Sequence, residues 1–344
     1  MRAARHQLNQ KAVTHRLEFR QYRFPFGQMV RTAHGPWVER EGLLIRLEDD
    51  AGRIGYGEVA PIPAFGTETL AEAVDLLAKL GGTADATSLD RIDERYGCVR
   101  FALASALGRG TAGPAVTQLP VAALLPAGKA ALAAADQALE NGFVAFKWKV
   151  GVLEVNDEMV VLDDLLARLP AHAKLRIDAN GAWTVRQAAK VLESCAARPI
   201  EFVEQPVAPE EVDSLTGLAR DFPTTLALDE SVTGPASLRE WLERGWPGVL
   251  VVKPALAGAP ASLLTLLASH RADVVFSSAF ETAVGRQAAL QVAFQFAGRP
   301  PRALGFGVVP LFKDGRIDGL PAVPFLTIEA VKAINPEAVW NALN

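Results

Sequence analysis

The sequence predicts an α/β fold in which a closed β/α barrel follows a smaller α+β domain. The chain has 344 residues, a length that suits a barrel with one companion domain. After Pro114 it contains eight short apolar runs, each followed by a helical segment, which is the pattern of a parallel sheet. Polar residues end six of these runs at nearly equal intervals, as repeated strand–helix units would place them.

Composition narrows the classes of function. Half of the residues are hydrophobic, 22% are charged, and the formal net charge is -4. This charge offers no broad basic surface to nucleic acid, and no uncharged apolar stretch of about 18 residues is present to span a bilayer. Cys98 and Cys195 fit neither a disulfide framework nor metal-ligand spacing. We therefore expect a reduced, cytoplasmic protein without nucleic-acid or membrane partners; the oligomeric state stays open.

The chain divides into three predicted segments. Residues 1–112 should form the α+β domain, residues 113–310 the barrel that carries the active site, and residues 311–344 a C-terminal segment that returns to the first domain. Residues 1–15 are rich in Arg, Lys and His and lack the apolar run of a secretory signal. We expect a disordered tail there, with a targeting segment as the alternative.

Within the first domain, the alternating pattern from Leu17 to Glu58 predicts an antiparallel meander. Asp49–Gly52 supplies the turn chemistry inside it. Two helices are predicted after the meander, one over Thr67–Leu80 with Thr67 as its cap and one over Leu89–Leu107.

The eight apolar runs define the predicted barrel strands. They are Leu119–Leu124, Phe143–Val150, Lys174–Ala179, Ile200–Glu204, Thr225–Asp229, Gly248–Val252, Asp273–Ser277 and Ala303–Phe306. Six polar residues follow at intervals of 29, 26, 25, 24 and 24 residues, namely Lys149, Asp178, Glu204, Asp229, Lys253 and Ser277. Each lies at the carboxyl end of its run, the face on which barrel enzymes hold their active sites.

Three of these residues predict a metal site. Asp178, Glu204 and Asp229 end three successive runs, so their carboxylates should converge and repel one another. A single acidic residue at such a position commonly caps a helix or pairs with an arginine, but three at equal spacing favour a hard divalent cation. Mg²⁺ suits an oxygen-ligand site that keeps positions open for substrate, and Mn²⁺ is the alternative.

Three lysines predict acid–base chemistry beside that metal. The two-residue period of a strand places Lys147 and Lys149 on one side, and Lys253 should reach the same mouth from across the barrel. Two neighbouring ammonium groups disfavour each other's charge, and burial adds to this, so a neutral lysine becomes accessible as a general base. Base catalysis supplies roughly 10²–10⁴ in rate, which is too little alone. A metal on the oxygens of a substrate carboxylate would stabilise the charge of an enediolate.

Five motifs resemble the muconate-lactonising subgroup of the enolase superfamily, and the resemblance covers nearly the whole chain. They are Lys147-x-Lys149, Arg176-Ile177-Asp178-Ala179-Asn180, Glu204-Gln205-Pro206, Asp229-Glu230-Ser231 and Lys253-Pro254. Three further stretches are similar to the o-succinylbenzoate synthase family within that subgroup. They are Gly57-Glu58-Val59-Ala60-Pro61-Ile62-Pro63, Phe146-Lys147-Trp148-Lys149-Val150-Gly151 and Ser277-Ser278-Ala279-Phe280-Glu281.

The resemblance implies an enolase-like fold, a modified TIM barrel of the (β/α)7β type under an α+β N-terminal capping domain. It implies a Mg²⁺-dependent syn dehydration of 2-succinyl-6-hydroxy-2,4-cyclohexadiene-1-carboxylate to 2-succinylbenzoate, in menaquinone or phylloquinone biosynthesis. By position it also implies residue roles. Lys149 is the base, Lys253 faces the enediolate, and Asp178, Glu204 and Asp229 bind the metal. The implied supporting residues are Lys147, Arg176, Asn180 and Glu230.

Two segments are candidates for contact with the substrate. Phe26–His34 corresponds to a flexible loop that closes over substrate in the family, which makes Gly27 and Arg31 candidate binding residues; an ordinary surface loop is the alternative. Ser277 and Ser278 are expected to present backbone N–H groups to the succinyl side, although serines at strand ends are common.

Related reactions remain as alternatives. The eighth run, which ends Leu304-Gly305-Phe306-Gly307-Val308, lacks the Asp-x-Asp that dipeptide epimerases carry. His270 precedes its run and should lie on the opposite face, which disfavours a mandelate-racemase type of base. N-succinylamino acid racemisation stays open because it needs lysines on two faces. Muconate cycloisomerisation and a catalytically silent carboxylate-binding barrel are weaker alternatives.

Overall fold

The computed structural model describes residues 13–32, 35–108, 113–296, 298, 302–308 and 310–343. Every helix within these ranges is too short or too polar to cross a membrane. The chain forms an antiparallel N-terminal sheet with three α-helices, followed by a parallel barrel and a short C-terminal segment.

The predicted meander is confirmed. Its sheet has the strand order β3-β2-β1-β4 and contains β1 (His15–Thr32), β2 (Gly35–Glu48), β3 (Ile54–Val59) and β4 (Thr83–Ala84). The Asp49 side chain accepts hydrogen bonds from the N–H groups of Ala51 and Arg53, each at 2.9 Å, and so closes the predicted turn. The sheet is joined by η1 (Pro63–Phe65), α1 (Leu70–Lys79), α2 (Ala86–Arg91) and α3 (Gly97–Ala106).

Two details of the predicted helices are wrong. The cap of α1 is Thr69, whose side chain accepts from the Glu72 N–H while Glu72 accepts from the Thr69 N–H. Thr67 instead accepts from the Ile62 N–H and holds the preceding loop. The predicted helix Leu89–Leu107 is two helices, because a turn closed by the Tyr96 N–H and the Asp93 carbonyl separates α2 from α3.

The second to seventh predicted runs each contain one barrel strand, whereas the first, Leu119–Leu124, overlaps both β5 (Gln118–Pro120) and the barrel strand β6. Seven strands form one parallel sheet of order β12-β11-β10-β9-β8-β7-β6, namely β6 (Ala123–Leu125), β7 (Ala145–Lys149), β8 (Lys174–Asp178), β9 (Ile200–Glu204), β10 (Leu226–Leu228), β11 (Val249–Val252) and β12 (Val274–Phe276). The eighth run forms single bridges instead of a full strand. Leu304 pairs in parallel with Val121, and Gly305 pairs with Ser277, so the eighth run closes the ring between β12 and the start of β6.

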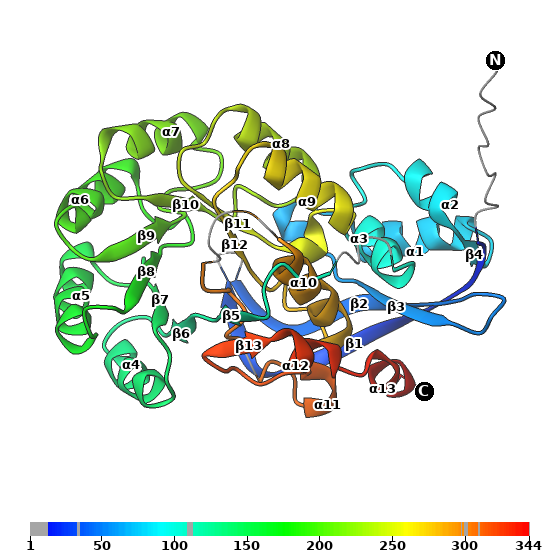
Figure 1. Ribbon diagram of the computed structural model, residues 1–344. Coiled ribbons are helices and arrows are strands. Elements are labelled where there is room, and N and C mark those ends of the chain that lie inside the picture. Colours follow the sequence, from blue (N-terminus) through cyan, green and yellow to red (C-terminus); the bar gives the residue numbers. More distant parts are fainter. Residues whose placement is uncertain are drawn as a thin grey trace, which may run out of the picture.

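Helices surround the strands, as Figure 1 shows for the arc from α4 to α9. The outer helices are α4 (Ala130–Glu140), α5 (Val155–Arg168), α6 (Val185–Cys195), α7 (Val212–Asp221), α8 (Pro235–Glu243), α9 (Pro260–Ser269) and α10 (Ala283–Gln295), with η2 (Pro254–Leu256) after β11. The strand order and the outer helices agree with an enolase-like modified TIM barrel.

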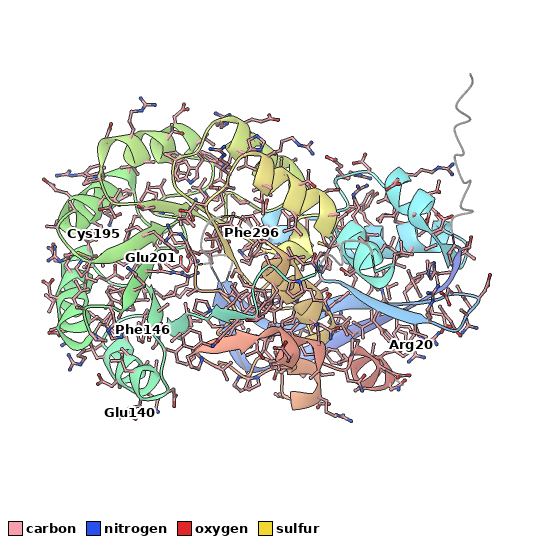
Figure 2. The ribbon with its side chains drawn as sticks, in the orientation of Figure 1. Arg20, Glu140, Phe146, Cys195, Glu201 and Phe296 are labelled. Carbon is pink, nitrogen blue, oxygen red and sulfur yellow. The ribbon has the colours of Figure 1, made fainter. Side chains whose placement is uncertain are left out.

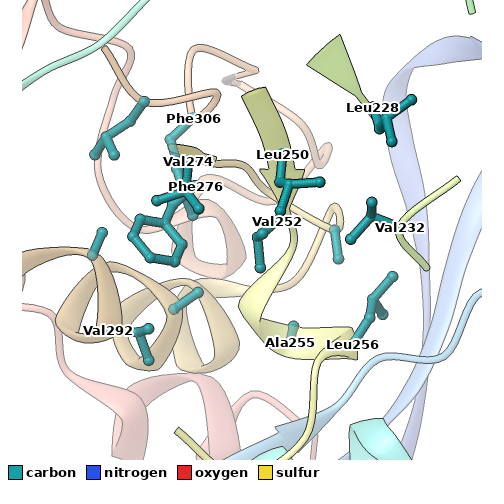
Figure 3. Close-up of a cluster of buried hydrophobic side chains, with 14 of the residues drawn as sticks. Leu228, Val232, Leu250, Val252, Ala255, Leu256, Val274, Phe276, Val292 and Phe306 are labelled. Atoms are coloured by element: carbon teal, nitrogen blue, oxygen red, sulfur yellow. The ribbon is translucent and has the colours of Figure 1, made fainter. Parts of the chain in front are cut away.

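Alternate residues of each strand face opposite sides of the barrel wall. Leu250, Val252, Val274 and Phe276 point toward the helices and pack in the layer shown in Figure 3, with Val292 of α10. The intervening side chains of the strands form a separate interior cluster that contains Phe202, Ala227, Val249, Val251 and Val275. The period of two therefore decides which polar residues enter the barrel.

The C-terminal segment contacts both parts of the protein. It contains α11 (Gly315–Asp318), β13 (Phe325–Thr327), α12 (Ile328–Lys332) and α13 (Pro336–Asn341). Strand β13 pairs with β5 (Gln118–Pro120), which precedes β6. Arg20 of β1, labelled in Figure 2, donates to the Trp340 carbonyl at 3.1 Å and lies 4.1 Å from the centre of that ring. The Gly27 N–H also donates to the Leu311 carbonyl.

Candidate active site

The strand period brings the predicted polar residues to one end of the barrel interior. Glu204 is two residues beyond the interior residue Phe202, and Asp229 is two beyond Ala227. Lys253 follows Val251 in the same way. In the strand register, Lys149 lies opposite Asp178, and Asp178 lies opposite Glu204. Three neighbouring strands therefore end in a lysine and two acids, side by side at the carboxyl mouth.

Lys147 bridges two of the acids. Its Nζ lies 3.0 Å from Asp178 Oδ2 and 2.7 Å from Glu204 Oε1, and all three side chains are largely buried. Burial lowers the pKa of Lys147, but the negative charges of Asp178, Glu204 and Asp229 outweigh burial and hold that pKa above its usual value. The lowering of lysine pKa expected from the Lys-x-Lys pair therefore does not hold for Lys147. The acids keep this group cationic.

Lys253 pairs with the third acid on the other side of the mouth. Its Nζ donates to Asp229 Oδ1, and both side chains are less than a tenth exposed. Burial opposes ionisation of Asp229, but the charges of Lys253 and Lys147 hold the pKa of Asp229 below its usual value. The ammonium of Lys253 also lies 5.2 Å from the ring centre of Phe65, which the N-terminal domain supplies through η1.

Glu204 and Glu230 carry raised pKa values. Burial, with the charges of Asp178 and Asp229, raises the pKa of Glu204 to about 8 against the opposing effect of Lys147. Burial and the same two charges raise the pKa of Glu230 to about 7. The Asn180 side chain donates to Glu230 Oε1 at 2.9 Å, while Glu230 Oε2 is buried without a hydrogen-bond partner. The mouth thus concentrates negative charge that two lysines only partly offset.

This donor set suits a hard cation. Asp178, Glu204 and Asp229 offer oxygen atoms alone, and all three residues are at most 6% exposed. As they stand, no three acidic, histidine or cysteine side chains among the described residues enclose a metal position, and lysine ammonium groups contact these three acids. The raised pKa of Glu204 and the unpaired Glu230 oxygen indicate a site that would gain from added positive charge.

Gln205 organises the mouth, and the sequence analysis assigned it no role. It is fully buried with a φ of 35°, and its Oε1 accepts from the N–H groups of Asp229 and Ser231, each at 3.1 Å. Its Nε2 donates to Ser231 Oγ at 2.9 Å. One glutamine therefore fixes the backbone that presents Asp229 to the site. Its place directly after Glu204, in the quoted Glu-Gln-Pro motif, was the available signal.

The structure corrects the expected supporting role of Arg176. This side chain enters the barrel two residues before Asp178 and bonds away from the mouth. Its Nε donates to Glu201 Oε2 at 2.7 Å and its Nη1 to the Ala303 carbonyl at 2.7 Å. Arg302 joins Glu201 to Asp273 beside it. These contacts lie at the amino ends of β9 and β12, where Figure 2 labels Glu201, so Arg176 closes the opposite end of the barrel.

The backbone role expected for the two serines is also wrong. The Ser277 N–H donates to the Val252 carbonyl at 2.9 Å, and the Ser278 N–H donates to the Gly305 carbonyl at 3.2 Å. Pairing with β11 therefore occupies the Ser277 N–H, and barrel closure occupies that of Ser278. The Ser277 side chain bonds to Gly305, and that of Ser278 bonds to Glu281.

The expected substrate loop is largely a strand. Phe26 and Gly27 lie in β1, whose pairing with β2 is interrupted between Pro25 and Val30 and resumes from Val30 to Thr32. Phe26 instead forms an antiparallel bridge with Phe312. Gly27 contacts the C-terminal segment through its bond to Leu311. The side chain of Arg31 and residues 33 and 34 lie outside the described part of the chain.

Comparisons with known proteins agree with this fold and these motifs. Residues 130–321 match the family described as "Enolase C-terminal domain-like", and residues 14–109 match the family described as "MenC, N-terminal domain". The o-succinylbenzoate synthase of Thermosynechococcus vestitus is 40% identical over 85% of this chain and 92% of its own. The o-succinylbenzoate synthase of Pectobacterium atrosepticum is 32% identical over 88% of this chain and 92% of its own.

Solved structures give the same result. The o-succinylbenzoate synthase of Thermosynechococcus elongatus BP-1, solved with Mg in its active site, has a TM-score of 0.83 and 38% identity, covering 95% of this chain and 99% of that one. The L-Ala-D/L-Glu epimerase of Bacillus subtilis has a TM-score of 0.77 at 20% identity, covering 91% of this chain and 95% of that one, which shows the shared fold alone. The chain therefore belongs to the o-succinylbenzoate synthase family of the enolase superfamily.

Proposed function

We propose that this enzyme converts 2-succinyl-6-hydroxy-2,4-cyclohexadiene-1-carboxylate into 2-succinylbenzoate by a Mg²⁺-dependent syn dehydration, through an enediolate. Membership of the family supports the reaction. The observation that carries the mechanism is the meeting of lysines from two sides of the barrel with three buried carboxylates. This arrangement can remove a proton beside a carboxylate and hold the charge that results.

Lys149 is the proposed base. It ends β7 on the same face as Lys147 and lies in register with Asp178, so its half-buried ammonium or amine group shares the mouth with the acids. In a syn elimination the proton and the hydroxyl leave from one face of the ring. The proton that Lys149 takes from the carbon is therefore close to the departing hydroxyl, and its transfer there releases water. Lys149 ends the reaction in its starting protonation state.

The other charged groups hold the substrate carboxylate. Asp178, Glu204 and Asp229 would bind Mg²⁺, which supplies positive charge to the carboxylate oxygens as the enediolate forms. Lys253 offers a second cation from the opposite strand, held in place by Asp229. Lys147 holds Asp178 and Glu204 close together through its two contacts. Asn180 fixes Glu230 beside them.

N-succinylamino acid racemisation is a second candidate, because Lys149 and Lys253 end strands on different sides of the mouth. A 1,1-proton transfer needs one group on each face of the reacting carbon. The eighth run carries Gly305 and Gly307 at its end, where no side chain is present to bind a substrate amine. The site therefore accommodates an N-acylated amino acid better than a free dipeptide amine.

A paired assay tests the proposal. The purified protein is incubated with the cyclohexadiene carboxylate and, separately, with N-succinylamino acids, in Mg²⁺ and again in chelator. We expect dehydration that stops when Mg²⁺ is removed, with a kcat/KM above that of racemisation. Racemisation without dehydration would overturn the synthase proposal and leave the metal and lysine assignments in place.

A further inference from the structure

Glu58, in β3 of the N-terminal domain, reaches across to the barrel and binds the start of α10. It is fully buried, and its carboxylate accepts from the Thr282 N–H at 2.9 Å and the Gly285 N–H at 2.8 Å. It also accepts from the Thr282 hydroxyl and, at 2.6 Å, from Tyr22 of β1. A negative group at a helix N-terminus is favourable, and these donors satisfy both of its oxygens.

Gly285 permits this close approach. A Cβ added there would lie 2.9 Å from Glu58 Oε2, closer than real side-chain contacts allow. The first turn of α10 is therefore shaped to receive a carboxylate from the other domain.

Arg40 of β2 binds the same barrel segment, at residues that precede Thr282. The residue is 2% exposed, and its guanidinium donates to the Phe280 carbonyl at 3.2 Å and the Ala279 carbonyl at 3.4 Å. The same group donates to the Ala60 carbonyl and, at 2.7 Å, to the Pro61 carbonyl in its own domain. The planar fork of one arginine thus joins the loop after β3 to the loop after β12.

The segment that Glu58 and Arg40 bind, Ser277–Thr282, leads from the mouth of the barrel into α10. Phe280 lies within it at a φ of 58°, a left-handed conformation that costs free energy for a residue with a side chain. Its ring packs edge-on against Trp37 of the β1–β2 hairpin at 5.5 Å, so neighbouring side chains hold the conformation. Lys149 ends β7 and Lys253 follows β11, on strands other than β12.

We propose that Arg40 and Glu58 are positioning residues that hold Ser277–Thr282, the connection at the carboxyl end of β12, on the face where barrel enzymes bind their substrates. The inference rests on the proposed function and adds that substrate affinity depends on docking of the N-terminal domain. The base and the acids stay on strands that the two residues do not touch. Loss of the hydrogen bonds of either residue therefore weakens substrate binding more than it slows the chemical step.

The test compares Glu58→Gln and Arg40→Lys with Asp85→Ala. In Glu58→Gln the amide has a single acceptor oxygen and cannot accept from both sets of donors, and Arg40→Lys removes the fork that spans two loops. Asp85 is a matched control, because it caps α2 by accepting from the Ser88 N–H at 2.7 Å and is not among the groups that bond to Ser277–Thr282. We expect Glu58→Gln and Arg40→Lys to raise KM about tenfold, with kcat changed less than about threefold. Asp85→Ala should lower Tm and leave KM unchanged.

Hydrogen–deuterium exchange of the peptide 277–285 gives a readout that needs no substrate. We expect faster exchange there in Glu58→Gln and not in Asp85→Ala. An unchanged KM with unchanged exchange in folded Glu58→Gln would overturn the inference, as would an equal rise in KM for Asp85→Ala. If Glu58→Gln does not fold, Tyr22→Phe removes one donor and keeps the helix contacts, and the same two readouts apply to it. A wild-type protein without dehydratase activity would refute the proposed function. The exchange experiment would still show whether Glu58 holds the segment 277–285 in place.

Discussion

Lys147 lies 2.7 Å from Glu204, inside the barrel, at the point where two neighbouring strands end. Together with the Lys147–Asp178 contact and the Lys253–Asp229 pair, this contact explains how three acids remain close together in the folded chain. It also separates the two lysines of the Lys-x-Lys motif, because Lys147 is committed to the acids by its contacts with Asp178 and Glu204. Lys147 is therefore a structural cation of this motif, and Lys149 is the proposed base.

Stability of the metal-free protein should fall as pH rises from about 5 to about 8. In the unfolded chain Glu204 and Glu230 lose their protons near ordinary carboxyl values, whereas the folded chain holds them up to a pKa of about 8 and about 7. The folded state binds more protons in this range, so the free energy of unfolding decreases with pH. Calorimetric Tm values in chelator check the slope, which Glu204→Gln should flatten. An identical slope in Glu204→Gln would contradict the prediction.

Asp178→Asn should weaken Mg²⁺ binding by at least about tenfold, since loss of an outer-shell group alone commonly has that effect. The substitution removes a charged oxygen at the mouth and leaves a side chain of the same shape. Isothermal titration calorimetry with Mg²⁺ measures the affinity of the variant. Asp163→Asn, an exposed carboxylate paired with Arg198 on the outer helices, serves as the control and should bind Mg²⁺ normally. Equal affinities in both variants would remove Asp178 from the metal site.

Arg176→Met should destabilise the fold by about 3–5 kcal/mol, because it leaves Glu201 buried with only part of its pairing. The folded fraction should keep its kcat/KM, since Arg176 bonds at the end of the barrel away from the acids. Chemical denaturation and steady-state kinetics measure the two effects. Arg198→Ala breaks an exposed pair and should cost at most about 1 kcal/mol. A large fall in kcat/KM of folded Arg176→Met would restore its supporting role at the active site.

The polar residues at the strand ends were predictable, because the local sequence pattern determines where each strand ends and which side its residues face. Period-two alternation and even spacing placed Asp178, Glu204 and Asp229 on one face, and the structure brings them to one mouth. Arg176 lies two residues before Asp178 in β8, so alternation puts both on one side of the strand. Alternation does not tell which end of the barrel its long side chain reaches. A buried arginine takes the acceptors that tertiary packing offers, here Glu201 and the Ala303 carbonyl.

Contacts between distant segments were not predictable from local patterns. The N–H groups of Ser277 and Ser278 looked available, but that of Ser277 bonds to Val252 of β11. The eighth run returns to the first and takes the N–H of Ser278 as it closes the ring. The link from Glu58 to Thr282 joins residues 224 positions apart. A single sequence gives no sign that these two residues are in contact, except that Glu58 is an acidic residue in one of the quoted motifs.

Activity of Lys149→Ala tests the central claim most directly. Because base catalysis contributes roughly 10²–10⁴, dehydration of the cyclohexadiene carboxylate should fall by about that factor or more. Folding and Mg²⁺ affinity should be retained, as measured by Tm and titration, and the exposed Lys174→Ala should keep full activity as a matched control. Turnover by Lys149→Ala at the wild-type rate would contradict the assignment of Lys149 as the base.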